Sequence, residues 1–159
     1  MRKRSALLGC FVAALLALLV TLPLAAAAKN EHRLTLSVRY NLNPGPPITG
    51  TGTWAACCAV DDVGTTQGVV NITSVKNDYA SIEGTHTFQS PLGTFSDVYT
   101  GTLGPLSSVN QIAEGHAKLL PGTGAYAAIH GQVKFVVVVD GRTGTGTGIH
   151  EGHIHFGKG

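Results

Sequence analysis

Histidine and glutamate side chains fall on two segments with the alternating pattern of β-strands. His86 has the same parity as Ile82 and Phe88, so we expect it on the apolar face of its segment. Glu114 and His116 share one face of a later segment. Inside an apolar lumen, such groups would have shifted pKa values and could move protons during a cyclisation or isomerisation. They are therefore the candidate catalytic residues, and the alternative is that they are satisfied core or rim residues.

Four aromatic side chains are candidates for lining a pocket. They are Trp54, Phe88, Tyr99 and Tyr126. Large aromatic rings contribute much apolar contact area, whether the contact is a ligand or the rest of the core. The sequence thus predicts either a ligand-binding pocket lined by these rings or a core that they fill.

The chain closes with three histidines in the pattern H-x-x-H-x-H. On a strand, His153 and His155 share one face and lie ~7 Å apart at Cα. Imidazoles at that spacing could bind Zn or Cu, with Glu151 on the same face. The alternative is that Ile154 and Phe156 face the core and the histidines face solvent. We expect no other metal or cofactor.

Two cysteines, Cys57 and Cys58, are adjacent in the chain. Neighbouring side chains on a strand point to opposite faces, so we expect one thiol to be buried and the other to face outward. A vicinal disulfide or an intermolecular bridge is the alternative in an oxidising compartment.

These residues are positioned by eight short β-like segments separated by Gly, Pro, Asn and Asp. Most alternate between apolar and polar residues, and the seventh is a continuous run of mainly β-branched residues. Such a series predicts an all-β sandwich or barrel. Many glycines within the segments favour an eight-stranded antiparallel barrel, because strongly coiled sheets need small residues. The segments are 33–40, 48–60, 65–75, 79–89, 94–103, 111–120, 134–139 and 145–156.

One stretch, residues 121–131, breaks the β pattern. Its Gly-Thr-Gly followed by an alanine-rich sequence predicts a tight turn and one short helical turn near 123–130, with Gly131 as its C-terminal cap. We expect this stretch to cross one mouth of the barrel, with Tyr126 and Ile129 packed inward as a plug.

The first 28 residues have the pattern of a signal peptide. A basic start at Arg2, Lys3 and Arg4 precedes an apolar run, and small residues end at Ala28. An uncleaved membrane anchor is the alternative. Residues 29–159 then form a single β-barrel domain, secreted to the periplasm or the extracellular space. Cleavage turns the net charge of +2 slightly negative, and without a basic patch we expect neither nucleic acid nor a membrane as a partner.

Three stretches resemble a known family. The first begins with residues 52–56 and continues to Asp61, the second is 82–88 together with 93–95, and the third is 122–126 together with Gly131. They are similar to secreted bacterial relatives of the allene oxide cyclase and dirigent β-barrels. The resemblance implies an eight-stranded antiparallel barrel with a mostly apolar interior, in a family that includes cyclases and stereochemical guides. It does not transfer an active site, because no stretch matches the catalytic glutamate environment of the plant cyclase. A weaker likeness to the lipocalin Gly-x-Trp motif rests on Gly52 and Trp54.

These observations predict two functions. The first is binding of a small apolar ligand without catalysis. The alternative is a cyclase or isomerase that acts on a reactive hydrophobic substrate in the lumen, with His86, Glu114 and His116 handling protons. The number of copies in the assembled protein does not follow from the sequence.

Overall fold

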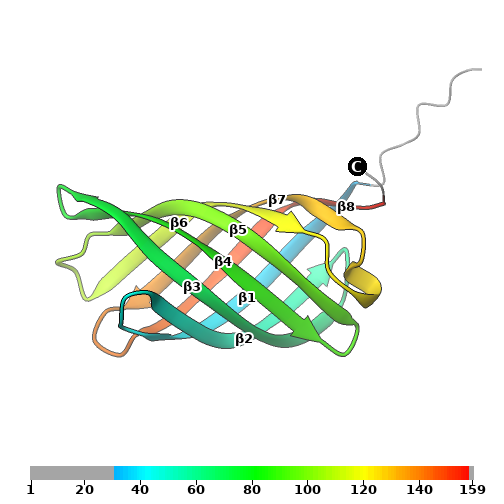
Figure 1. The fold of residues 1–159 in the computed structure, drawn as a ribbon, viewed down its shortest axis with the longest axis horizontal. Coiled ribbons are helices and arrows are strands. Elements are labelled where there is room, and N and C mark those ends of the chain that lie inside the picture. The colour runs from blue at the N-terminus through cyan, green and yellow to red at the C-terminus, as the bar shows by residue number, and fades with distance from the viewer. Residues whose placement is uncertain (1–30, 158–159) are drawn as a thin grey trace, which may run out of the picture.

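Eight antiparallel strands close into a barrel, in which each strand pairs with its neighbours in the sequence and β8 pairs with β1 (Figure 1). The structure is a computed structural model and describes residues 31–157. Closure confirms the predicted barrel and decides against a two-sheet sandwich. The strands are β1 (Glu31–Asn43), β2 (Ile48–Cys58), β3 (Asp62–Lys76), β4 (Tyr79–Ser90), β5 (Gly93–Gly104), β6 (Asn110–Leu120), β7 (Ile129–Asp140) and β8 (Thr145–Phe156).

Alternation along each strand separates the barrel interior from the outer surface. In β7 the run of valines hides this alternation, because apolar residues occupy both faces. Val137 and Val139 are buried in the interior, whereas Val136 and Val138 are 51% and 44% exposed outside. Every second residue of a strand points to the same face, so one parity in β7 forms core and the other forms surface.

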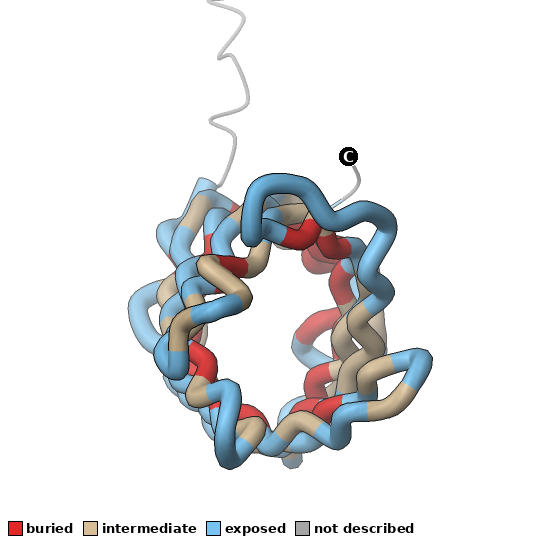
Figure 2. The backbone as a smooth tube through the Cα atoms, turned by 90° about the vertical axis from the view of Figure 1, so that its left-hand side faces the viewer, coloured by how far each residue is buried: buried red, intermediate tan, exposed pale blue. Residues whose placement is uncertain are grey.

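The two ends of the barrel are different (Figure 1). We call one end the open mouth; it carries the loops 44–47, 77–78, 105–109 and 141–144. Figure 2 views the barrel from this end, with buried positions along the inside of the ring. We call the other end the closed end; it carries the turns 59–61 and 91–92 and the connection 121–128.

The connection at the closed end contains the predicted helical turn, a 3₁₀ turn at Gly124–Tyr126 (η1). Tyr126 is 2% exposed and packs inward, as predicted; Ile129 is 0% exposed, but it belongs to β7 and not to the connection. The Tyr126 hydroxyl donates to Asp62 Oδ2 at 2.6 Å and ties η1 to the start of β3. The prediction for Gly131 was wrong: it lies inside β7 and pairs with Ile154 instead of capping a helix.

The expected signal peptide, residues 1–28, lies outside the described residues. Within residues 31–157, no helix is long and apolar enough to cross a membrane.

Candidate functional site

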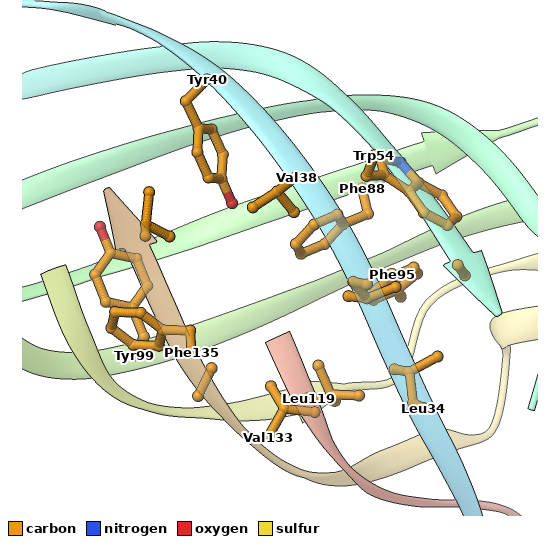
Figure 3. Packing of buried hydrophobic residues seen from close by; sticks show 14 of the residues in the cluster. Leu34, Val38, Tyr40, Trp54, Phe88, Phe95, Tyr99, Leu119, Val133 and Phe135 are labelled. Atoms are coloured by element: carbon orange, nitrogen blue, oxygen red, sulfur yellow. The ribbon is translucent and has the colours of Figure 1, made fainter. Parts of the chain in front are cut away.

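The closed half of the barrel is filled by aromatic rings. Phe88 and Phe95 stack with centroids 4.6 Å apart, and Trp54 packs edge-on against Phe95 at 5.6 Å. Figure 3 shows these three rings grouped together, apart from Tyr99 and Phe135. Tyr126 completes the group, 4.8 Å from Phe95. Three of the four predicted ligand-binding aromatics, Trp54, Phe88 and Tyr126, therefore lie in packed core.

The open half of the barrel contains a cavity of about 80 Å³. Its wall is mostly apolar, and Tyr99 is the one predicted ligand-binding aromatic that lines it. Glycine or alanine occupies four positions of the wall, so these positions add no large side chain to the interior. The lining residues are Tyr40, Leu42, Ile48, Gly50, Gly68, Val70, Ile82, His86, Tyr99, Leu103, Ala113, Phe135, Val137, Val139, Gly146 and His150.

His86 lies in this wall, paired with a buried carboxylate. Asp97 is opposite His86 in the β4–β5 register, and its Oδ1 lies 2.9 Å from His86 Nδ1. The same oxygen accepts the His86 backbone N–H at 3.0 Å. The Asp97 side chain is 0% exposed and that of His86 is 12% exposed. Because Asp97 Oδ1 already accepts the backbone N–H, we assign it as the acceptor in this pair too, so Nδ1 carries the shared proton and Nε2 is the free nitrogen of the ring.

Two tyrosine rings hold the His86 imidazole in place. Tyr99 stacks on it at 4.6 Å and 15°, and Tyr40 at 5.3 Å and 23°. The Tyr99 hydroxyl donates to the Val69 carbonyl oxygen at 3.0 Å, which fixes that ring in turn. A Cβ at Gly68 would lie 2.4 Å from His86 Cδ2, so glycine leaves room for the imidazole.

A second histidine, His150, is buried beside the first. It is 1% exposed, and its ring lies 6.0 Å from that of His86. Burial, and then the nearby His86, lower the pKa of His150 to about 4, so the ring is uncharged at neutral pH. The expectation that the histidines of this strand face solvent was wrong for His150, which has the parity of buried Ile154 and faces the lumen.

We call Tyr40, His86, Asp97, Tyr99 and His150 the polar centre. Of the five buried side-chain polar atoms without a hydrogen-bond partner in the described part of the chain, four belong to it: Tyr40 Oη, Asp97 Oδ2, His150 Nδ1 and His150 Nε2. Burial, followed by Asp97 and Tyr99, raises the pKa of Tyr40, so its hydroxyl stays protonated. Each unsatisfied group destabilises the fold by about 1–3 kcal/mol. Such a cluster beside a cavity is typical of a functional site.

Glu114 and His116 do not join the polar centre. Both are exposed on the outside of β6, together with Ile112, while Ala113, Ala117 and Leu119 face inward. The predicted shared face was right, but the assignment of that face to the lumen was wrong. Small alanines hold the inner positions of β6, so the larger Ile112 was a misleading guide to the interior.

His153 and His155 lie at the end of β8, and each contacts one other residue that could bind a metal. His153 Nδ1 is 3.5 Å from Glu31 Oε1, and the His155 ring stacks on His130 at 5.2 Å. Within residues 31–157, no group of three or more His, Cys, Asp or Glu side chains is placed to hold a metal ion.

The two cysteines depart from the expected arrangement, because both are exposed. Cys58 has φ +83°, which breaks the strand alternation and turns its side chain toward that of Cys57. The two sulfurs lie 2.8 Å apart as free thiols.

Asp97 is the functional residue that sequence reasoning missed. It has the parity of Phe95 and Tyr99, so a carboxylate on an apolar strand face was the signal that could have found it. Its pairing with His86 needed the β4–β5 register.

The sequence matches no protein-family model and no curated protein.

Proposed function

We propose that this protein binds a small, mainly apolar molecule in the open half of its barrel, without transforming it. The observation that carries the proposal is the apolar cavity inside the barrel at the open mouth. Eight-stranded barrels have room for one small ligand where side chains do not fill them. The barrel also agrees with the resemblance to secreted allene oxide cyclase-like and dirigent-like proteins. We place the protein in the periplasm or outside the cell, where such a ligand would be its partner.

The cavity volume limits the ligand. An engineered apolar cavity of about 150 Å³ accepts benzene, and this cavity has about 80 Å³. A short alkyl chain lying along the barrel axis fits that space better than a ring. A longer molecule would place one end in the cavity and leave the remainder at the open mouth.

Titration of the purified protein with 1-butanol and 1-hexanol, followed by NMR, tests this proposal. Burial of a CH₂ group contributes ~0.8 kcal/mol, so two more should tighten binding by roughly tenfold. Ala113→Phe should abolish binding, because Ala113 is buried and lines the cavity. The matched control is Ile112→Phe, at the neighbouring position on the outer face of β6, which should bind like wild type. Equal affinity for the two alcohols, or undiminished binding to a folded Ala113→Phe variant, would refute the proposal.

A second candidate function is that of an isomerase or cyclase. It is favoured by one observation, the His86–Asp97 pair in the cavity wall. A carboxylate that orients an imidazole is a recurrent arrangement for general acid–base catalysis.

A further inference from the structure

The lining of the cavity restricts the chemistry that could occur there. Its polar groups are imidazoles and phenols, and no lining residue is a serine, threonine, cysteine or lysine. Those four types are common nucleophiles in covalent catalysis. What the wall offers is proton transfer and hydrogen bonding.

His86 is arranged as a base. Its Nδ1 is bonded to Asp97, so the tautomer leaves the lone pair of Nε2 unshared. Tyr40 and Tyr99 both stack on the His86 imidazole, and this stacking fixes the plane of the imidazole ring. A carboxylate behind an imidazole also stabilises the imidazolium that forms when Nε2 takes a proton.

Hydrogen-bond donors for a developing negative charge lie beside this base. Tyr40 has an O–H group and neutral His150 an N–H group, and none of these polar atoms has a partner. Other protein atoms cover these groups, so an enolate oxygen can reach one of them only if its side chain turns toward the ligand. A donor that meets an oxyanion in a dry site stabilises it strongly.

We propose that, although most apolar ligands are bound unchanged, the polar centre enolises a small ketone when one is bound in the cavity. His86 Nε2 removes a proton from the carbon next to the carbonyl; the C–H electron pair forms a C=C bond, and the carbonyl π electrons move to the oxygen. The enolate oxygen accepts a hydrogen bond from Tyr40 or His150. The imidazolium then returns its proton to carbon, at the original position or, in a β,γ-unsaturated ketone, at the γ carbon to give the conjugated isomer. No co-reactant is needed.

This inference rests on the proposed site of binding and deepens the second candidate function. It is tested with 2-hexanone in D₂O, by following exchange of the C1 and C3 protons by NMR. We expect the protein to accelerate exchange at least tenfold over free imidazole at equal concentration, since a positioned base contributes ~10²–10⁴. His86→Gln should remove the acceleration and Tyr40→Phe should reduce it. His32→Gln is the control, because His32 is exposed at the start of β1.

The two failures are distinguishable. If 2-hexanone causes no chemical-shift changes in the cavity residues, the binding site itself is wrong. If it binds there but exchanges no faster than with free imidazole, or equally fast with Tyr40→Phe and His86→Gln, enolisation is wrong. Should His86→Gln fail to fold, Tyr40→Phe and His150→Phe together still decide, because they remove the two candidate donors, neither of which has a partner in the fold. Unchanged exchange in both variants would refute enolisation.

Discussion

At the scale of single residues, the burial of His150 should make the stability of the barrel depend on pH. Its pKa is about 4 in the fold, against about 6.5 in an unfolded chain. Between these values the unfolded chain binds more protons, so stability rises with pH across this window and is lost as pH falls through it. The shift corresponds to about 3 kcal/mol.

Replacing His150 by Phe should remove this dependence. The ring of Phe needs no hydrogen bond, so the variant should also be more stable at pH 7 by about 1–3 kcal/mol. Urea unfolding at pH 4.5 and pH 7 measures both effects, with exposed His32→Gln as the control. A His150→Phe variant that loses as much stability on acidification as wild type would show that His150 is not the buried neutral group described above.

The sequence allowed us to predict which residues of a strand share a face. It did not allow us to predict which residue of the neighbouring strand each of them contacts. His86 was assigned to the apolar face from its spacing to Ile82 and Phe88, and it does line the cavity. Glu114 and His116 have one parity too, but their strand has apolar residues on both faces. Spacing along one strand does not say which residue of the next strand lies opposite, so Asp97 was missed.

At the scale of elements, close strand approach depends on particular glycines. A Cβ at Gly84 in β4 would lie 1.9 Å from the Val69 carbonyl oxygen and 2.5 Å from the Tyr99 hydroxyl. Those two groups are hydrogen-bonded to each other. Glycine at this position therefore allows β3 to pack closely and Tyr99 to reach across β4.

Gly84→Ala should destabilise the barrel by more than ~3 kcal/mol, because the added methyl meets rigid backbone and overpacking in a dense interior already costs about 1–3 kcal/mol. Gly50→Ala is the matched comparison: its Cβ would meet the tip of the Leu42 side chain at 3.0 Å, which can move. It should change stability by less than ~1 kcal/mol. Thermal unfolding of both variants measures the difference, and equal melting temperatures would contradict this account.

The strands themselves were largely predictable, because alternation and turn residues mark them. The exception is the start of β7, where Ile129 and Gly131 were assigned to the helical connection. Both belong to the strand, and Gly131 has φ +150° there. A Cβ at Gly131 would lie 2.3 Å from the His153 carbonyl oxygen, so contact with β8, and not a helix end, explains this glycine.

At the scale of the whole molecule, the barrel divides into a packed half and a hollow half. Large rings such as Trp54 and Phe95 fill the closed end, whereas Gly50, Gly68 and Ala113 line the open half. The register between strands gathers the large rings at the closed end and the small residues in the open half. Because this register does not follow from the sequence, the sequence could not show whether the lumen is packed or open.

Intermolecular NOEs from bound 1-hexanol to assigned methyl groups test the central claim most directly. We predict contacts to Leu42, Val137 and Val139, which line the cavity, and none to Val136 and Val138 on the outer face of the same strand. We also predict none to Leu119 in the packed core. Contacts confined to the outer valines, or no contacts to the cavity methyls at saturation, would contradict the account.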